Sequence, residues 1–338
     1  CDWKGKGKNT NWNNKKYSGG LILKIVSLNR LNEIENELRK QFPNEEFKFY
    51  DKAINIPIND RKTMDILIGY DGKIDRTFIE HCINLKWIGW FATGVNNLPL
   101  NYIKERDIIL TNGKGIQAKQ VSEYIMTFIL HDYKKMKTSY RNQLEKNYDS
   151  RITGKRLNEE TLLFLGTGAI AQRAAYLAKA FGMKVIGVSK SGKNVEQFDE
   201  VYTIEELDDV IEKANIIVNA LPETEETIYL LKRKDFIQMD NNALFINVGR
   251  GTIVDEEVLI NVLKDRLIRH AYLDVFEKEP LSKDNPLYDL DNVTITAHIT
   301  GNDSNNNREA TDIFKKNLEH FLNNYDVIEN KVDLDYGY

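Results

Sequence analysis

Apolar runs of strand length alternate with helical patterns along almost the whole chain, and this alternation limits the possible folds more than any other feature. The pattern is most regular from residue 161 onward, where helical segments separate the first five of six apolar runs. Strands connected through helices form a parallel sheet with helices on both faces. A doubly wound α/β domain is therefore predicted, with these strands: Leu162–Leu165, Lys184–Val188, Ile216–Ala220, Ala243–Val248, Ala271–Phe276 and Val293–Thr296.

A second, smaller α/β domain is predicted from the part of the chain that precedes residue 118. A helical pattern over Asn32–Gln41 follows its first apolar run. We expect a flavodoxin-like sheet of parallel strands there. Five apolar runs predict the strands: Leu21–Leu28, Glu46–Tyr50, Met64–Gly69, Trp87–Phe91 and Ile108–Leu110.

A long helical stretch from about Gln120 to Leu144 joins the two halves, with apolar residues at steps of three and four. We expect one connecting helix with enough apolar surface for a second domain or a partner subunit. The last helix, about Arg308–Asn323, is expected to pack back on the smaller domain. The predicted domains are therefore a discontinuous smaller one, residues 21–117 and 303–338, and a larger one, residues 118–302.

Composition and charge narrow the classes of function. A formal net charge of -4 over 338 residues gives no electrostatic case for nucleic acid as a partner. No run approaches 18 apolar residues, so no membrane span is predicted, and the spacing of Cys and His does not match a metal site. Residues 1–20 are polar and rich in Asn, Lys and Gly, which predicts a disordered leader or tag. Cys82 is expected to be a buried, reduced thiol of a cytoplasmic protein.

A glycine turn opens the larger domain directly after its first strand. Gly166 permits the tight turn, Gly168 lets a pyrophosphate approach the backbone, and Ala171 is small enough for close packing of helix on strand. The helix that follows presents its N-terminal amides to the phosphates. At the first strand–helix junction of six strands, this pattern predicts a dinucleotide-binding Rossmann domain. The cofactor-binding residues expected in this turn are Gly166, Thr167, Gly168, Ala169 and Ile170.

The next strand ends in Ser189, Lys190 and Ser191, where an NAD-binding site usually carries Asp or Glu. This strand end carries no carboxylate that would repel a 2′-phosphate. The side chains of Lys190 and Lys193 can pair with such a phosphate. The sequence therefore favours NADP(H). Because Lys is a poorer bidentate binder than Arg, NAD(H) stays open, and both lysines can also be plain solvated charges.

Two later strand ends are expected to line the same cofactor crevice, because open α/β sheets bind ligands at the carboxyl ends of their strands. Leu221, Pro222 and Thr227 follow one strand and would lie beside the dinucleotide. Val248 and Gly249 end another strand and would pass under the nicotinamide ring.

Arg250 stands between two glycines, where a buried strand turns into a loop. Arginine is almost never fully buried without a partner. Its planar guanidinium suits a two-point grip on a carboxylate. The alternative is an arginine that pairs with a nearby acid of the same turn, and the local sequence does not separate the two interpretations.

The last two strands end in polar segments that complete a candidate catalytic group. Glu277 and Glu279 follow one strand and His298 follows the other. Histidine is the natural proton donor and acceptor near neutral pH, and an adjacent carboxylate would fix its tautomer. Together with a nicotinamide as hydride source, this arrangement suits reduction of the carbonyl group of an acid substrate.

These segments resemble the D-isomer-specific 2-hydroxyacid dehydrogenases, in particular their glyoxylate/hydroxypyruvate reductase-like branch. The family's Asn-x-x-Arg-Gly motif appears at 247–251, and its Leu-Asp-Val-Phe-x-x-Glu-Pro-Leu motif at 273–281. Its Thr-Pro-His-x-x-Gly motif appears at 296–301, with Ala297 in place of proline.

The resemblance implies a role for each matching residue. Arg250 would bind the 2-oxo acid, Glu279 rather than Glu277 would tune His298, and His298 would be the acid/base. Asp274 would hold the nicotinamide amide. The family's carboxylate-binding loop resembles residues 91–98, which implies substrate binding by Thr93, Gly94 and Val95, and the cofactor would also contact His298 and Gly301.

The predicted activity is NADP(H)-preferring reduction of a small 2-oxo acid to the D-2-hydroxy acid, and the reverse, in a homodimer. A phosphoglycerate or D-lactate dehydrogenase-like enzyme that uses NAD is the first alternative. A dinucleotide-sensing corepressor-like binding protein is the second. Aromatic residues that are candidates for the wall of the substrate pocket include Tyr70, Trp87, Trp90, Phe91 and Tyr148.

Overall fold

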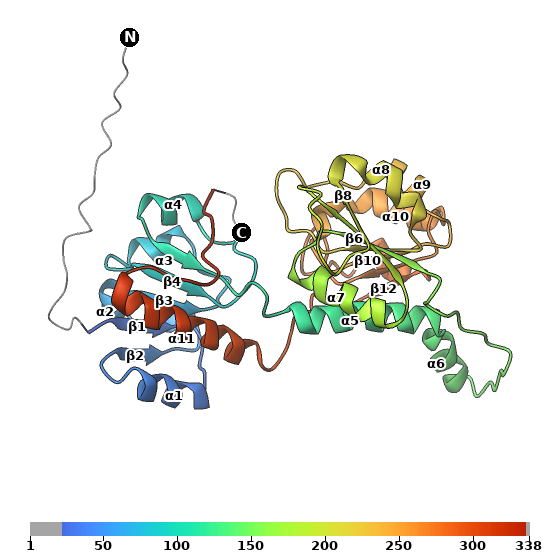
Figure 1. The fold of residues 1–338 in the computed structure, drawn as a ribbon. Coiled ribbons are helices and arrows are strands. Elements are labelled where there is room, and N and C mark those ends of the chain that lie inside the picture. Colours follow the sequence, from blue (N-terminus) through green and yellow to red (C-terminus); the bar gives the residue numbers. More distant parts are fainter. Residues whose placement is uncertain (1–21, 336–338) are drawn as a thin grey trace, which may run out of the picture. The chain divides into compact units, whose positions relative to one another are not determined.

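The computed structural model describes residues 22–335 and divides the chain into two compact units (Figure 1). The predicted leader lies outside the described residues. One unit runs to Asn112 and resumes at Thr311, and the other spans Gly113–Ala310; the division predicted from sequence was at residues 117 and 302. Each unit is built on a parallel sheet with helices around it, which confirms the predicted α/β class.

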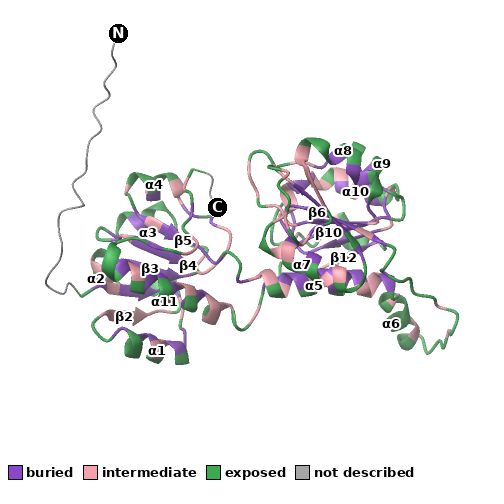
Figure 2. Ribbon diagram, in the orientation of Figure 1, coloured by how far each residue is buried: buried purple, intermediate pink, exposed green. Residues whose placement is uncertain are grey.

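The sheet of the first unit has five parallel strands in the order β2-β1-β3-β4-β5, which is the flavodoxin type. The two middle strands β3 and β4 are fully buried, whereas the edge strand β2 is mostly half-buried (Figure 2). The strands are β1 Lys24–Ser27, β2 Glu46–Phe49, β3 Ile66–Gly69, β4 Trp87–Trp90 and β5 Ile109–Thr111.

Helices cover this sheet, and the helix from the far end of the sequence is one of them. Its side chains Phe314 and Phe321 are buried, with ring centroids 5.1 and 5.4 Å from that of Trp87. Trp87 is therefore part of the core, and the expectation that it lines a substrate pocket was wrong. The helices are α1 Glu33–Gln41, α2 Ile58–Thr63, α3 Arg76–Glu80, α4 Leu100–Glu105 and α11 Asn306–Asn324, with a 3₁₀ turn at Ala53–Asn55.

The second unit holds a seven-stranded parallel sheet in the order β12-β11-β10-β9-β6-β7-β8. Strand order reverses around β6, as in the doubly wound dinucleotide-binding fold. The six predicted strands are all present, but β8 was missed because its sequence Glu-Val-Tyr-Thr is half-buried at the sheet edge and contains no apolar run. The strands are β6 Thr161–Leu165, β7 Lys184–Ser189, β8 Glu200–Thr203, β9 Ile216–Asn219, β10 Leu244–Asn247, β11 His270–Leu273 and β12 Val293–Ile295.

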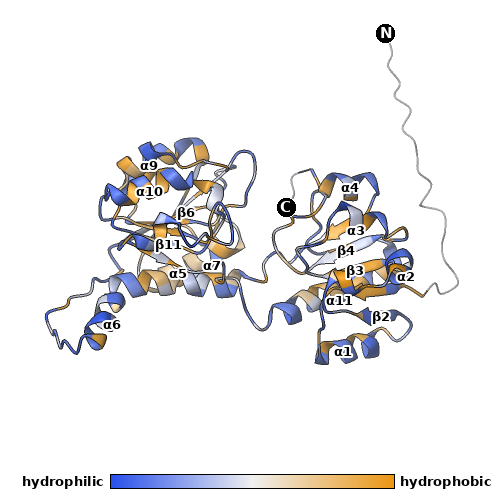
Figure 3. Cartoon of the chain, turned by 180° about the vertical axis from the view of Figure 1, so that it is seen from behind, coloured by the Kyte–Doolittle hydropathy of each residue, from blue (hydrophilic) through white to orange (hydrophobic). Residues whose placement is uncertain are grey.

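The predicted helix over 120–144 is two helices, so that expectation was wrong. The chain leaves α5 after Tyr133, and Lys135 takes a left-handed conformation with φ 56°. The apolar face of α5 is buried in the second unit, whereas α6 buries none of its residues and is largely hydrophilic (Figure 3). The helices of this unit are α5 Ala118–Tyr133, α6 Met136–Leu144, α7 Ala169–Ala180, α8 Leu207–Val210, α9 Arg233–Gln238 and α10 Glu256–Lys264, with 3₁₀ turns at Ile204–Glu206, Ile211–Lys213, Gly251–Ile253 and Pro286–Asp289.

Candidate active site

His298 and Glu279 come together at the carboxyl ends of β12 and β11. Nδ1 of His298 lies 2.7 Å from Oε2 of Glu279, and both side chains are partly exposed. The other carboxylate oxygen of Glu279 accepts a hydrogen bond from the amide of Phe276 at 3.0 Å. Glu279 is thus fixed by the backbone and orients the imidazole ring. In the described part of the second unit no hydrogen bond occupies Nε2 of His298, which leaves that nitrogen for proton exchange with a ligand.

Glu277, the other acid of this segment, has a different task. Its carboxylate accepts hydrogen bonds from the hydroxyl of Tyr229 and from the amide of Glu256 at the start of α10. These contacts bind Glu277 to a neighbouring loop and a helix N-terminus. The structure therefore pairs His298 with Glu279 and leaves Glu277 as a structural acid.

The loop that carries His298 is held by Asp274, a carboxylate with no exposed surface. Its oxygens accept hydrogen bonds from the hydroxyl of Thr296 at 2.6 Å, the amide of Ile299 at 2.9 Å, and the amide and hydroxyl of Thr300 at 3.1 and 2.6 Å. These bonds use the whole acceptor capacity of a carboxylate. Asp274 thus fixes the histidine loop, and contact with a nicotinamide amide would require exchange of one of these bonds.

The backbone of His298 is itself unusual, with φ at 52° in the left-handed region. A residue other than glycine adopts this conformation only where its surroundings impose it. The amide of His298 donates to the carbonyl of Asp274 at 2.8 Å, and the carboxylate of the same residue holds the next two amides. The loop is therefore held without the proline that the family pattern has at position 297.

The Arg250 loop is shaped by two fully buried asparagines at the ends of β9 and β10. Asn219 donates to the side-chain oxygen of Asn247 at 2.8 Å, and Asn247 donates to the carbonyl of Arg250 at 3.0 Å. The amide of Gly249 also donates to Asn247, at 3.2 Å. Asn219 was not recognised from sequence, although a polar residue that ends a fully apolar strand is a signal that can be read.

Gly251 allows this loop to pass against the backbone that leads to Glu279. A Cβ atom at Gly251 would lie 1.9 Å from the carbonyl carbon of Phe276, far inside any van der Waals contact. A Cβ at Gly249 would lie 2.7 Å from both Asn219 Nδ2 and the carbonyl oxygen of Leu221. Both positions therefore require glycine, and the close approach joins the loops that follow β9, β10 and β11.

The guanidinium of Arg250 is half-buried and donates to the carbonyl of Gly249 at 2.8 Å. Within the described residues of the second unit, no carboxylate forms an ion pair with it. The interpretation as an arginine paired with an acid of its own turn is therefore not what the structure shows. A permanently charged fork that lacks an acidic partner within its own unit is suited to bind an acidic ligand.

The glycine turn after β6 has room for a phosphate. Gly166 takes φ of 98°, and a Cβ built on Gly168 would meet nothing within 4 Å. Gly168 also caps α7, whose first residues are Ala169 and Ile170. The side chain of Gln172 donates to the carbonyl of Thr167 at 2.8 Å and fixes the turn. A positive φ, an open space at the helix N-terminus and amides directed into it fit the pyrophosphate of a dinucleotide.

The end of β7 carries a polar atom without a partner. Oγ of Ser189 is buried and, among residues 22–335, has no hydrogen bond. Lys190, next to it, contacts both carboxylate oxygens of Glu226 at 2.5 and 2.8 Å. Ser191 is exposed and accepts from the amide of Lys193 at 3.4 Å. Sequence reasoning missed Glu226, because nothing in the local pattern indicates which distant acid a lysine meets.

The remaining predicted cofactor residues of the second unit lie at strand ends of the same sheet. The amide of Leu221 donates to Asn219, and the hydroxyl of Thr227 donates to the carbonyl of Pro222 at 2.7 Å. Val248 is buried, and Gly301 accepts a long hydrogen bond of 3.5 Å from Gln117. These residues shape loops, and the hydroxyl of Thr227 is already engaged within the protein.

The predicted substrate loop belongs to the first unit and is fixed by buried side chains. Nε1 of Trp90 donates to the carbonyl of Gly94 at 3.0 Å, and the side chain of Asn112 donates to the carbonyl of Thr93 at 2.9 Å. Val95 has no exposed surface. The carbonyls of this loop thus face protein donors. Tyr148, a predicted pocket wall, belongs to the second unit and is 96% exposed.

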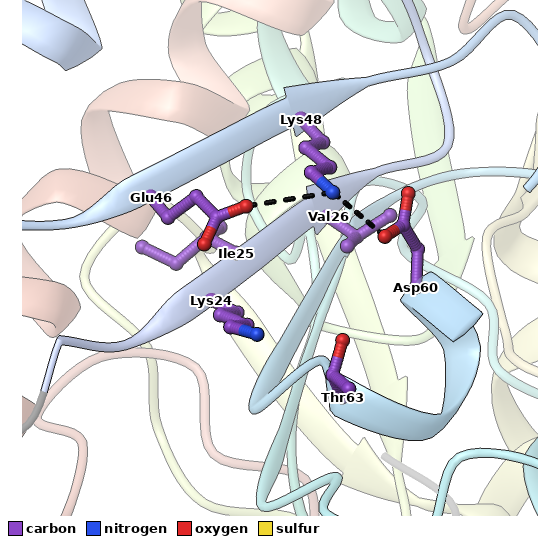
Figure 4. Close-up of a pocket in the computed structure, with 7 residues that line it drawn as sticks. All are labelled: Lys24, Ile25, Val26, Glu46, Lys48, Asp60 and Thr63. Atoms are coloured by element: carbon purple, nitrogen blue, oxygen red, sulfur yellow. Dashed lines mark hydrogen bonds and ion pairs between the residues drawn. The ribbon is translucent and has the colours of Figure 1, made fainter. Parts of the chain in front are cut away.

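A pocket beside β1 and β2 holds polar side chains but none of the predicted site residues (Figure 4). Lys48 lies 2.7 Å from Asp60 and 3.4 Å from Glu46, and the hydroxyl of Tyr50 also contacts Asp60. Burial favours the neutral acid, but hydrogen bonds from Lys48 and Tyr50 outweigh it and lower the pKa of Asp60. The charges satisfy one another, so this group attaches α2 to the sheet edge.

In the part of the chain that the structure describes, no three His, Cys, Asp or Glu side chains gather closely enough to hold a metal ion. None of the described helices combines the length and apolar character that a membrane span requires.

Comparisons with known proteins identify the family. The model for the NAD binding domain of D-isomer specific 2-hydroxyacid dehydrogenases matches residues 126–300. The D-3-phosphoglycerate dehydrogenase of Methanocaldococcus jannaschii is 32% identical over 276 residues, 81% of this chain and 52% of that protein. Glyoxylate/hydroxypyruvate reductase B of Yersinia pestis is 30% identical over 243 residues, 69% of this chain and 73% of that protein.

Solved structures agree with this assignment. A D-isomer specific 2-hydroxyacid dehydrogenase family protein from Aeromonas salmonicida has a TM-score of 0.83 and 29% identity, covering 93% of this chain and 99% of that chain. The chain spans only about half the length of the phosphoglycerate dehydrogenases that it matches, 52% and 45% of two of them. By the matched domain, the fold and the identity to its relatives, the chain belongs to the D-isomer specific 2-hydroxyacid dehydrogenase family.

Proposed function

We propose that the protein reduces a small 2-oxo acid of the glyoxylate or hydroxypyruvate type to the D-2-hydroxy acid, and catalyses the reverse. The observation that carries this proposal is the contact of Nδ1 of His298 with Glu279 at 2.7 Å, on a strand end two strands away from Arg250, which has no acidic partner within its unit. A proton donor and a carboxylate-binding fork are what reduction of a 2-oxo acid requires from the protein.

Each residue of this group has one task in the proposed reaction. Arg250 binds the carboxylate and polarises the neighbouring carbonyl. The nicotinamide ring supplies the hydride to the carbonyl carbon when the cofactor is bound. Nε2 of His298 gives its proton to the carbonyl oxygen, and Glu279 stabilises the imidazolium that donates it. In the reverse direction His298 takes the proton of the hydroxyl group.

We also propose the binding residues. Thr93, Gly94 and Val95 bind the carboxylate of the substrate, in a loop that Trp90 and Asn112 fix through hydrogen bonds to the carbonyls of Gly94 and Thr93. The dinucleotide is bound by the turn after β6 and by the segments that follow β7, β9, β10, β11 and β12. These residues are Gly166, Thr167, Gly168, Ala169, Ile170, Ser189, Lys190, Ser191, Leu221, Pro222, Thr227, Val248, Gly249, Asp274, His298 and Gly301.

For the cofactor we propose NADP(H) ahead of NAD(H). The support is the strand end of β7, where Ser189 and Lys190 replace the usual acid, and where the buried hydroxyl of Ser189 has no partner within the described residues. The alternative is an NAD-using phosphoglycerate or D-lactate dehydrogenase-like activity. The ion pair of Lys190 with Glu226 favours it, because this pair supplies a carboxylate that β7 itself lacks.

We further propose that the working form is a homodimer in the cytoplasm. Apolar side chains at four-residue steps are exposed on and after α6, namely Met136, Tyr140, Leu144 and Tyr148. An exposed apolar row is a typical contact surface for a second copy. The buried free thiol of Cys82 suits a reducing compartment. Sedimentation of wild type against Tyr140→Ser tests the dimer: wild type should sediment as a dimer, whereas a monomeric wild type would contradict the proposal.

The activity is tested with a panel of 2-oxo acids, each assayed with NADPH and with NADH. We expect turnover with a small 2-oxo acid, and a loss of about 10²- to 10⁴-fold in kcat for His298→Ala with unchanged cofactor affinity. His270→Gln is the matched control, because His270 lies inside β11 and bonds Thr294. A dinucleotide-sensing binding protein would bind cofactor without turnover, and equal rates for wild type and His298→Ala would overturn the acid/base assignment.

A further inference from the structure

The ion pair between Lys190 and Glu226 connects two loops that lie on opposite sides of the glycine turn. Nζ of Lys190 contacts both carboxylate oxygens of Glu226, at 2.5 and 2.8 Å, and the two side chains are 70% and 66% exposed. Lys190 follows β7, and Glu226 lies in the loop that follows β9.

The order of the strands places the Lys190–Glu226 ion pair relative to the glycine turn. In the sheet, β6 lies between β9 and β7 and pairs in parallel with both strands. Neighbouring strands are about 4.8 Å apart, so β7 and β9 are about twice that distance from each other. A side-chain bridge between the loops after β7 and β9 therefore passes over the carboxyl end of β6, where Gly166 and Gly168 turn the chain.

Glu226 is presented by a loop with its own internal hydrogen bonds. The hydroxyl of Thr227 accepts from the amide of Thr224 at 2.8 Å and donates to the carbonyl of Pro222 at 2.7 Å. The amides of Thr227 and Ile228 also bond to the carbonyl of Thr224, at 3.0 and 3.1 Å. The carboxylate is thus delivered to Lys190 from a fixed turn.

The strand end beside the pair offers one further group for a ligand. Ser189 Oγ is buried and has no hydrogen bond among the residues that the structure describes. A buried hydroxyl without a partner is rare and costs free energy unless a ligand completes it. Next to this hydroxyl, Lys190 is already occupied by Glu226.

We propose that Glu226 sets the cofactor preference of this protein by competing with the 2′-phosphate of NADP(H) for Lys190. With the pair intact, Glu226 supplies a carboxylate beside the end of β7, which itself carries none, and this carboxylate can accept from ribose hydroxyls. A 2′-phosphate must displace this carboxylate or lie beside it. The inference rests on the proposed dinucleotide site and specifies which residue adjusts it.

Binding of nucleotides that lack the nicotinamide isolates this effect from catalysis. The probes are ADP-ribose and 2′-phospho-ADP-ribose, titrated calorimetrically into the full chain. Glu226→Gln removes the competing charge and keeps the side-chain size, so its affinity for 2′-phospho-ADP-ribose should rise about fivefold or more while that for ADP-ribose stays the same or falls. Glu225→Gln is the matched control, because Glu225 is the exposed neighbour of Glu226.

A second variant tests whether the effect passes through the lysine. In Lys190→Met, affinity for 2′-phospho-ADP-ribose should fall, and adding Glu226→Gln should no longer raise it. The gain in the single variant should also shrink as salt is raised, because both side chains are exposed.

The outcomes separate this inference from the proposed function. Equal changes for both nucleotides in Glu226→Gln, or a full gain in the Lys190→Met background, would overturn the competition while the dinucleotide site stands. Failure of wild type to bind either nucleotide would overturn the site, and the inference with it. A selective, lysine-dependent gain supports the proposal.

Discussion

Two strand ends of the second unit differ in how firmly they are built. The end of β10 is held by the buried pair Asn219 and Asn247, and its glycines fit against neighbouring backbone with no spare volume. The end of β7 has a buried hydroxyl without a partner and an exposed ion pair. The end of β10 is fixed by close packing and buried hydrogen bonds. The end of β7 is held mainly by an exposed ion pair, whose partners can bind water instead.

The end of β7 should therefore tolerate substitutions better than the end of β10. In the proposed function Arg250 must keep one direction, because a two-point contact with a carboxylate depends on geometry. Its loop accordingly depends on residues with no freedom to vary. Recognition of a ribose substituent depends mainly on charge, which exposed side chains supply and exchange at little cost in stability. Stability measurements on single variants therefore test this difference between the two strand ends.

The largest effect is expected for Gly251→Ala. Its Cβ would lie 1.9 Å from the backbone carbon of Phe276, so the loops after β10 and β11 must move apart. We expect a loss of about 3–5 kcal/mol in the free energy of unfolding, measured by urea denaturation, together with loss of activity. Gly168→Ala is the control, since its Cβ would meet nothing within 4 Å. Equal unfolding midpoints for the two variants would contradict the tight packing at β10.

An intermediate effect is expected for Asn247→Ala. The substitution leaves the side chain of Asn219, the carbonyl of Arg250 and the amide of Gly249 each short of a hydrogen bond in a buried place. The free energy of unfolding should fall by about 1–3 kcal/mol, with a rise in KM for the acid substrate as Arg250 loses its direction. Asn242→Ala, at an exposed position before the same strand, serves as control. An unchanged midpoint would show that the asparagine pair is dispensable.

The smallest effect is expected for Ser189→Ala. The hydroxyl forms no hydrogen bond among the described residues, so its removal leaves no partner unsatisfied. Because a buried hydroxyl without a partner costs free energy, the free energy of unfolding in the absence of cofactor should not fall, and should rise by no more than about 1 kcal/mol. A clear loss of stability would reveal a role of Ser189 in the fold and would remove the contrast between the two strand ends.

Much of the fold could be predicted because apolar runs report burial directly. The runs for β6, β7, β9 and β10 are continuous since helices cover both faces of their sheet. The edge strand β8 escaped detection, because half-buried Glu200–Thr203 has the polarity of a loop. The break between α5 and α6 was also not predicted, because a change of backbone direction at Lys135 does not alter the spacing of apolar residues in the sequence.

The sequence allowed the site residues at strand ends to be predicted, but not the partners that reach them from distant loops. Arg250, Glu279 and His298 follow strands whose order the sequence implies, so their common edge could be inferred. Partners from distant loops could not be inferred, because nothing local links Lys190 to Glu226. The choice between the two interpretations of Arg250 likewise needed the structure, since only spatial neighbours show whether an acid of the same unit lies beside it.

The buried carboxylate of Asp274 links loss of activity on heating to unfolding of the whole domain. It joins the histidine loop to β11 through hydrogen bonds to Ile299 and Thr300, and the two bonds to Thr300 are buried. If these bonds keep the histidine loop attached while the sheet stays intact, heat inactivation of the proposed activity should follow the same curve as unfolding of the whole domain. Storage lifetime would then be set by the unfolding rate of the core, and a ligand that binds elsewhere on the folded domain would preserve activity as well as one bound at the histidine.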